Sequence, residues 1–353
     1  MKMKKKSIDL FDQIVGDAKV HIAFDRLRKS PPHWGARRLM NDLFQRMGDP
    51  DGNFVQDFQS HGFHSRLFEL ACHAYFEAQG LSIDRSLQRP DFLISYQGHQ
   101  VGVEAVTTNP ISGRDTDVAI FKMDEISFEE ILKKTNNEFS IRIGSALLTK
   151  LKKRYWNLPH CKGTPFVLLV GPFHEPGSVL YIDECLARYL YGIHRFNDWT
   201  EHNGLLVREV PIKTHESNGK SIQSNFFAQQ WTENISAIAF CNQFTIPRFY
   251  RMAMQLGLYS KTVLAIRKGF CMLPGGGRGD DVHEYQYGLN DPQAPQETWW
   301  QGVTFFHNPN ARYPLPKEAF ACTSAFRYHN GQLERKVYDA HTLTSFMYMT
   351  NSQ

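Results

Sequence analysis

The stretch that decides the fold is residues 90–106, which read PDFLISYQGHQVGVEAV. Two runs rich in apolar residues flank Gln97-Gly98, and a two-residue loop ending in glycine is a strong signal for a β-hairpin. With this loop as the turn, Asp91 lies directly opposite Glu104 on the neighbouring strand. The sequence therefore predicts that two carboxylates share one end of a hairpin.

The two strands, 91–96 and 99–106, have a mostly apolar face and a face that holds the acids, because side chains alternate along a strand. The apolar face consists of Phe92, Ile94, Tyr96, Val101, Val103 and Ala105. Like charges directly opposite in a sheet repel, so Asp91 and Glu104 suggest a cation between them. Carboxylate oxygens suit Mg²⁺ or Mn²⁺. A register slip of one residue would turn every side chain to the other face.

The composition describes a chain able to bury a core, with 353 residues, 42% hydrophobic residues and a formal net charge of +4. This mild basic excess permits nucleic acid as a partner without proving it. The six cysteines form no C-x-x-C motif, which fits a reducing cytoplasm. Acidic residues follow the basic start MKMKKK, so we expect no signal peptide. The sequence has no apolar run of about 18 residues, so we expect no membrane span.

Periodicity and turn residues predict a mixed sheet with flanking helices, an α/β or α+β fold. The expected helices are 8–28, 34–47, 65–79, 128–135, 141–156, 181–192 and 247–257, and the further strands are 165–170, 236–240 and 263–266. The expected irregular segments are loops at 107–127 and 273–300 and a polar insertion at 195–235. We expect an N-terminal helical extension (1–60), a core (61–270) and a loop-rich C-terminal extension (271–353) packed on that core.

Glu69 on a helix, Pro90-Asp91 at the start of a strand and Glu104 in the next strand together resemble the PD-(D/E)XK nuclease superfamily. The similar part covers about residues 63–170, and its flanking phrases resemble a group of uncharacterised bacterial proteins with this core. The resemblance implies the restriction-endonuclease-like fold, a mixed central sheet flanked by helices. It also implies a Mg²⁺-dependent (or Mn²⁺-dependent) endonuclease that acts on DNA, with bacterial defence as a role common in the family.

The resemblance assigns roles to individual residues. Asp91 and Glu104 become metal ligands, the carbonyl of Ala105 a further ligand, and Glu69 an accessory ligand that acts directly or through water. The metal would lower the pKa of bound water and neutralise charge that develops on a phosphodiester. Many relatives dimerise to cut both strands, so a homodimer is an option.

The sequence departs from the family at the lysine that normally follows the second acid, because this position is Val106. The expected helix 141–156 would, by resemblance, pack beside the active strands. We favour its Lys150 as the substitute, and Lys150 and Lys153 can share a helix face. Lys122 is the second choice.

Several alternatives stay open. Glu69 could be a solvated helix residue paired with His73, and the basic helix end could be a plain solvated face. Val106 could mark lost chemistry, which would leave a non-catalytic module that binds nucleic acid or a protein. A metal-dependent hydrolase of another phosphate ester is a third option. A Ser-His-Asp hydrolase is disfavoured, because the sequence has no G-x-S-x-G motif.

Overall fold

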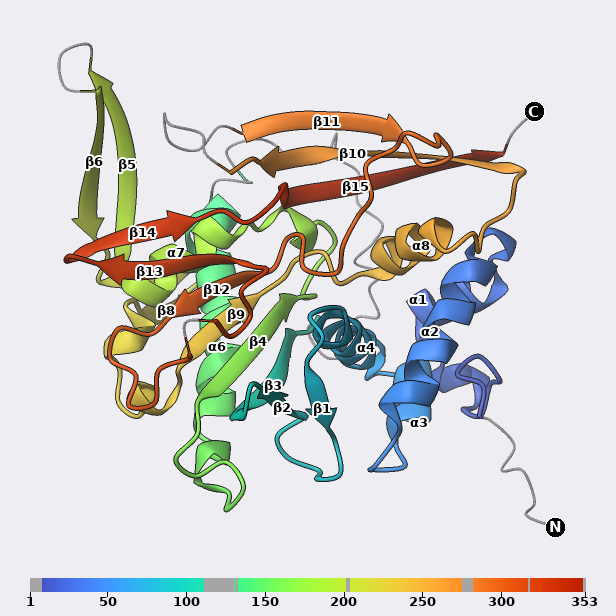
Figure 1. Ribbon diagram of the computed structural model, residues 1–353, viewed down its shortest axis with the longest axis horizontal. Helices are drawn as coiled ribbons and strands as arrows, with labels where there is room; N and C mark the ends of the chain where they lie inside the picture. Colours follow the sequence, from blue (N-terminus) through green and yellow to red (C-terminus); the bar gives the residue numbers. More distant parts are fainter. Residues whose placement is uncertain are drawn as a thin grey trace.

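An eight-stranded mixed sheet organises the protein, as shown by a computed structural model that describes residues 8–110, 130, 133–200, 204–274, 282–316 and 318–351 (Figure 1). In spatial order its strands are β1 (Ser82–Asp84), β2 (Phe92–Tyr96), β3 (His99–Thr108), β4 (Phe166–Pro172), β9 (Ala237–Phe240), β12 (Thr304–His307), β13 (Ser324–His329) and β14 (Gln332–Lys336). Strand β3 is antiparallel to β2 and parallel to β4, so the sheet contains both kinds of strand pairing.

The hairpin between β2 and β3 has the predicted register. Phe92 pairs with Val103 and Tyr96 with His99, which leaves Gln97 and Gly98 as the loop. Both loop residues have positive φ angles, 47° and 83°, as a twist-matched two-residue turn requires. The predicted hairpin is therefore confirmed, and Asp91 directly precedes β2 at the position that faces Glu104.

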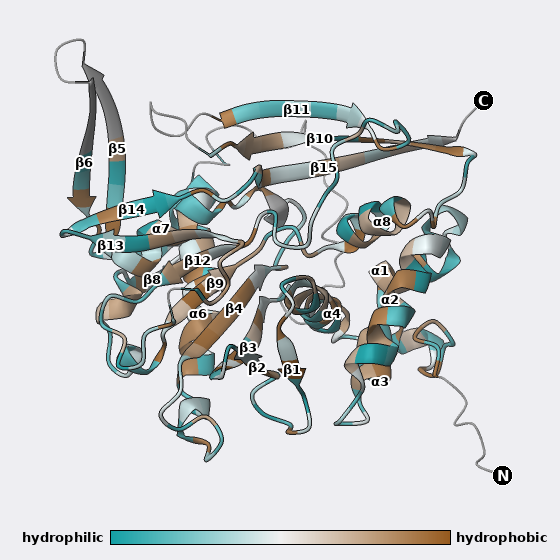
Figure 2. Cartoon of the chain, viewed as in Figure 1, coloured by the Kyte–Doolittle hydropathy of each residue, from teal (hydrophilic) through white to brown (hydrophobic). Residues whose placement is uncertain are grey.

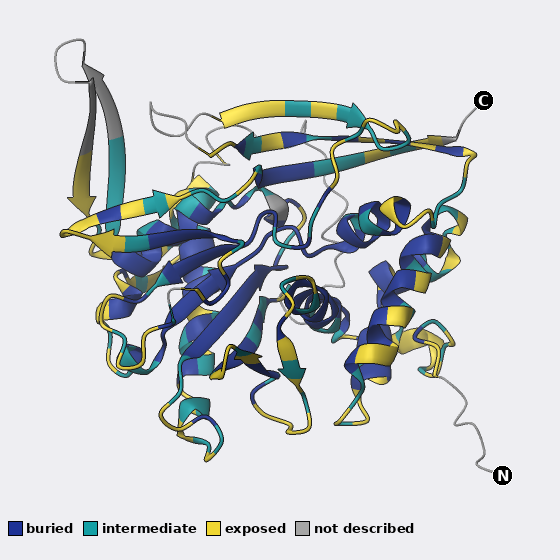
Figure 3. Cartoon of the chain, in the orientation of Figure 1, coloured by how far each residue is buried: buried dark blue, intermediate teal, exposed yellow. Residues whose placement is uncertain are grey.

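Helices cover both faces of the sheet. The helices are α1 (Ile22–Lys29), α2 (Trp34–Met47), α3 (Phe54–Gln59), α4 (Phe63–Ala78), α6 (Phe139–Leu151), α7 (Asp183–Tyr191) and α8 (Ile246–Gln255). Apolar residues of α4, such as Leu67, share one buried cluster with Phe92 and Val103. The opposite face of the sheet forms a second cluster with α6 and α7. The central strands are consequently apolar (Figure 2) and buried (Figure 3), with every residue of β4 and β9 buried.

A second sheet of three antiparallel strands lies beside the first and contains β11 (Val282–Gly288), β10 (Val263–Met272) and β15 (His341–Asn351). Two hairpins complete the strands, namely β5 (Ile193–Thr200) with β6 (Gly204–Pro211) and β7 (Thr214–Ser217) with β8 (Lys220–Gln223). Short helical turns occur at Asp17–Lys19, Pro31–His33, Lys134–Glu138, Tyr155–Asn157, Ser178–Leu180, Phe226–Ala228 and Thr232–Asn234. No helix within the described ranges is long and apolar enough to cross a bilayer.

The structure corrects several expected elements. The first helix begins at Ile22 rather than at residue 8, and the helix expected to reach residue 156 ends at Leu151. The segment 195–235 is not irregular, because most of it forms two hairpins. Residues 208–211 of β6 are exposed, so in this described part of the hairpin no buried apolar face marks the strand in the sequence.

The C-terminal region 271–353 contains far more strand than its loop-rich composition predicted. The stretch expected as one loop, 273–300, includes β11, whose residues are exposed or half-buried. Three further strands, β12 to β14, extend the central sheet. Residues 111–129 and 131–132, which include most of the expected loop 107–127 and helix 128–135, lie outside the described part.

Candidate functional site

The two predicted acids meet where strand β2 begins, beside the middle of β3. The backbone N–H of Asp91 donates to Oε2 of Glu104 at 3.2 Å. The N–H of Ala105 donates to Oδ2 of Asp91 at 2.8 Å. Each carboxylate therefore accepts a backbone hydrogen bond from the opposite side of the hairpin. These two bonds fix both carboxylates at the same end of the hairpin.

Helix α6 brings Lys150 to the same place. It packs against β3, and Nζ of Lys150 lies 2.6 Å from Oε1 of Glu104. The Glu104 side chain is 1% exposed, whereas that of Lys150 is 31% exposed. Val106, at the position of the usual family lysine, is buried in the apolar cluster under α6. The ammonium group of Lys150, predicted on helix 141–156, therefore lies beside the acids. It is supplied by α6 and not by β3, the strand that holds Glu104 and Val106.

Glu69 is buried in α4 and is held by two arginines. Its oxygens accept from Arg66 at 3.1 Å and from Arg85 at 3.5 Å. The alternative that Glu69 is a solvated residue paired with His73 is wrong, because Glu69 is 7% exposed and His73 pairs with Glu77. Helix α4 packs against the sheet on one side and against α2 and α3 on another, so several of its polar residues, Glu69 among them, are buried.

One cavity of about 390 Å³ gathers the predicted site. Its lining includes Glu69, Asp91, Glu104, Ala105 and Lys150. The other lining residues are Asp57, His61, Gly62, Ser65, Arg66, Arg89, Thr107 and Asn109. The structure therefore brings these five predicted residues together, although they lie far apart in the sequence. They come from α4, the start of β2, β3 and α6. Lys122 lies outside the described residues.

Sequence reasoning missed the arginines of this cavity. Arg66 is three residues before Glu69 on the same helix, and this spacing is a known signal for an ion pair. It also binds Asp57 at 2.7 Å, so it bridges α3 and α4. Arg89 has a weaker signal, its position just before Pro90-Asp91.

Burial and acidic neighbours make this site electrostatically unusual. Burial, together with the charge of Asp91, raises the pKa of Glu104 to about 7. The same two causes raise the pKa of Glu69 to about 7, against the opposing effect of its arginines. Burial disfavours the ammonium of Lys150, but Glu104 and Asp91 together raise the pKa of Lys150. Burial and mutual repulsion therefore disfavour the ionised form of these acids, and a divalent cation bound between Asp91 and Glu104 would offset that cost.

The donor set fits a divalent ion held by two carboxylates. Mg²⁺ commonly binds through one or two carboxylates and keeps several waters, and Asp91 and Glu104 provide that number. The N–H and C=O of a strand residue point to the same edge, so the Ala105 carbonyl faces Asp91 as its N–H does. Within the described ranges no three His, Cys, Asp or Glu side chains form a ready metal cluster. Since arginines engage both oxygens of Glu69, this acid fits an indirect role better than direct ligation.

Comparison of the chain with protein-family models, with curated proteins and with solved structures finds no match.

Proposed function

We propose that the protein is a metal-dependent nuclease that hydrolyses phosphodiester bonds, with DNA as its substrate. The observation that supports this most is the convergence of Asp91, Glu104 and Lys150 on one cavity, with Lys150 Nζ 2.6 Å from Glu104. Two carboxylates and one ammonium are the groups expected for metal-assisted phosphodiester hydrolysis. The order of helix α4, hairpin β2–β3, helix α6 and strand β4 agrees with the resemblance to PD-(D/E)XK nucleases.

Each residue of the cavity then has a distinct task. Asp91 and Glu104, with the Ala105 carbonyl, would hold Mg²⁺ or Mn²⁺. The bound ion would supply Lewis acidity at the phosphate and lower the pKa of a coordinated water. Lys150 has three N–H donors on a flexible stem and would orient the attacking water or a phosphate oxygen. Arg89 lines the cavity and is half-exposed, so it would contact a neighbouring phosphate of the strand.

The test is cleavage of supercoiled plasmid with Mg²⁺ or Mn²⁺, with and without EDTA. Lys150→Gln should lower the cleavage rate about 100-fold, since general acid–base or orienting groups contribute on this order. Lys153→Gln is the matched control, because it removes the same charge. Lys153 is exposed and does not line the cavity. The control variant should retain activity within about twofold. Full activity of Lys150→Gln would remove this lysine from the mechanism, and absence of cleavage with either metal would contradict the nuclease.

A second candidate is a non-catalytic module of the same fold that binds nucleic acid or a protein. The observation in its favour is that the acids have protein partners, because Lys150 pairs with Glu104 and two arginines pair with Glu69. This module would retard DNA in a gel without cutting it in Mg²⁺ or Mn²⁺. Neither cleavage nor retardation would point to the third option, another phosphate ester as substrate.

A further inference from the structure

Both carboxylate oxygens of Glu104, the most buried acid of the candidate site, have partners within the protein. Oε1 lies 2.6 Å from Nζ of Lys150, and Oε2 accepts the backbone N–H of Asp91 at 3.2 Å. The Glu104 side chain is 1% exposed. A divalent ion that binds this carboxylate must therefore share its oxygens with these two groups or replace one of them.

The two partners of Glu104 differ in their freedom to move. The N–H of Asp91 belongs to the backbone directly before β2, and the strand pairing of the hairpin keeps it in place. Lys150 carries its ammonium group on a flexible stem of four carbons, and its side chain is 31% exposed. Within the described part of the chain, this ammonium group makes no hydrogen bond or ion pair besides the one with Glu104. Lys150 is therefore the partner that can leave.

The cations that pair with the other buried acid of the cavity, Glu69, are held more firmly. Arg66 also binds Asp57 at 2.7 Å, which ties it to α3. Arg85 also lies over the ring of Phe92, 4.9 Å from its centroid. Each arginine would lose more than one interaction if it moved, so both are structural partners. Among the described residues, the lysine on α6 has no second polar contact of this kind, which makes it the exchangeable cation of the site.

Lys150 and a divalent ion would compete for Glu104. Two cations on one carboxylate lie within about 4 Å of each other, and their repulsion is strong where burial lowers the effective dielectric constant. Lys150 also lines the cavity of about 390 Å³. Its ammonium group can therefore turn from Glu104 to water or to a phosphate oxygen without leaving the site.

We propose that Lys150 is an exchangeable counter-ion of the metal site. It pairs with Glu104 while no divalent ion is bound, and it gives up this carboxylate when an ion binds. The inference rests on the proposed function and adds a step to it, because Lys150 becomes free to orient water or a phosphate oxygen only after this exchange. Lys150 therefore weakens metal binding by the free protein, although the reaction needs the same lysine.

Calorimetric titration of the full chain with Mn²⁺, in the absence of nucleic acid, measures this exchange without an activity assay. Lys150→Gln should lower the Kd for Mn²⁺ about tenfold, because binding no longer has to break one charge-assisted contact. Lys150→Arg keeps a cation beside Glu104 and should leave the Kd at the wild-type value or above it. Rescue of the weaker binding by arginine would show that the charge at this position, and not the shape of the side chain, sets the affinity.

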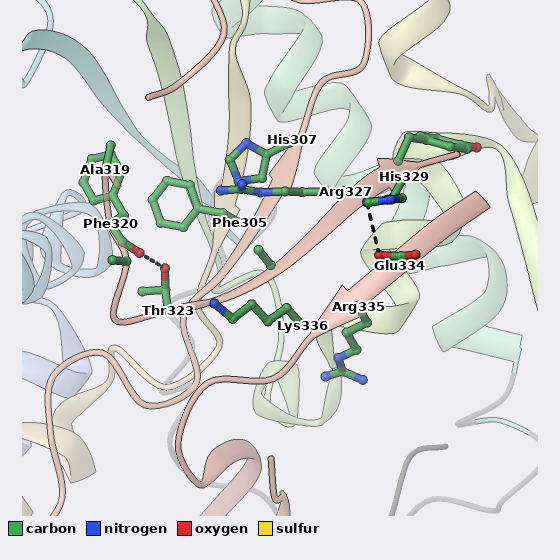
Figure 4. A pocket seen from close by; sticks show the side chains of 13 residues that line it. Phe305, His307, Ala319, Phe320, Thr323, Arg327, His329, Glu334, Arg335 and Lys336 are labelled. Carbon is green, nitrogen blue, oxygen red and sulfur yellow. Dashed lines mark hydrogen bonds and ion pairs between the residues drawn. The ribbon is translucent and has the colours of Figure 1, made fainter. Parts of the chain in front are cut away.

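Two exposed lysines outside the cavity provide matched controls, because Lys153→Gln and Lys336→Gln each remove one positive charge. Lys153 follows α6 closely and reports the general effect of charge near the site. Lys336 lines a separate cavity over β12 to β14, at the far end of the central sheet (Figure 4). Each control should change the Kd by less than about twofold, since salt screens exposed charges.

The proposal is overturned if Lys150→Gln binds Mn²⁺ no more tightly than the wild-type protein does. Exchange predicts tighter metal binding together with slower plasmid cleavage in this variant, whereas loss of a purely structural lysine would weaken both. Glu104→Gln shows which idea has failed. If it abolishes Mn²⁺ binding, the metal site is correct, and an unchanged Kd in Lys150→Gln removes the exchange alone. If the wild-type protein binds no Mn²⁺ at about 1 mM, or Glu104→Gln binds it equally well, the metal site and the exchange are both wrong.

Discussion

Two groups of buried carboxylates in this protein have pKa values that are shifted in opposite directions. At the candidate site, burial and the charge of Asp91 raise the pKa values of Glu69 and Glu104 to about 7. Glu297 and Asp183 are equally buried, yet cationic neighbours hold the pKa of each well below its usual range. The difference lies in the neighbours, because the acids of the first group face another acid and those of the second face mainly cations.

The second group fastens elements together. Glu297 binds Arg251 of α8 at 2.7 Å and Arg267 of β10 at 3.2 Å, and it also pairs with Arg248. Asp183 at the start of α7 binds Arg335 of β14 at 2.7 Å and His341 of β15 at 3.0 Å. These acids face mainly cations, whereas Glu69 and Glu104 pair with cations and also face the carboxylate of Asp91. Under the proposed function, this contrast separates acids that hold elements together from acids that bind a metal ion.

The largest expected effect is on stability. Glu297→Gln removes the anion from three buried guanidinium groups and should lower the free energy of unfolding by about 3–5 kcal/mol. Glu104→Gln at pH 8 should lower it by less than about 1 kcal/mol, because this acid is repelled by Asp91 when ionised. Urea denaturation at pH 8 measures both values. Equal losses in the two variants would show that the two groups of acids do not differ.

The next effect is the dependence of stability on pH. In the folded state Glu69 and Glu104 have pKa values near 7, above the ordinary value of 4.5, so between these limits the folded protein binds more protons than the unfolded chain. Their contribution is therefore complete below about pH 4.5 and is lost as the pH rises through 7, by at most about 1.4 kcal/mol per pH unit for each group. Denaturation curves at pH 5, 6, 7 and 8 should show this decline.

Two variants separate the contributions. Glu104→Gln should have a shallower decline between pH 5 and 8, because the amide does not titrate. Glu297 has a lowered pKa, so its contribution is present above the unfolded value and is lost as the pH falls toward acid. Glu297→Gln should therefore leave the pH 5–8 slope unchanged while it lowers stability overall, because the ion partners of Glu297 are arginines, which do not titrate in this range. An unchanged slope in Glu104→Gln would contradict the raised pKa.

The smallest effect is the response to metal. At pH 8 and constant ionic strength, Mg²⁺ at about ten times its Kd should stabilise the wild-type protein by about 1.4 kcal/mol, since a ligand of the folded state adds RT ln(1 + [L]/Kd). Glu104→Gln should show no stabilisation at the same concentration. Thermal unfolding measures this without any activity assay. Equal stabilisation of both proteins would place the ion elsewhere.

The local parts of the fold and site were predictable from sequence, and the long-range parts were not. The hairpin from Phe92 to Val103 follows from alternation and a two-residue turn, which are properties of adjacent residues. The pairing of β9 with β12 joins residues more than 60 positions apart, and nothing in either strand specifies its partner. Buried arginines such as Arg248 were missed for a related reason, because arginine is usually exposed and only tertiary contacts show otherwise.

The Asp91 carboxylate stands where the ladder between β2 and β3 would otherwise continue, since its Oδ2 accepts the N–H of Ala105. One oxygen thus closes the end of a strand, and under the proposed function the carboxylate also binds the metal ion. Asp91→Ala would disturb both the strand end and the charge, because it would leave the partly buried N–H of Ala105 without its acceptor. Asp91→Asn keeps an acceptor oxygen and removes the charge. It is therefore the substitution that distinguishes a loss of sheet structure from a loss of activity.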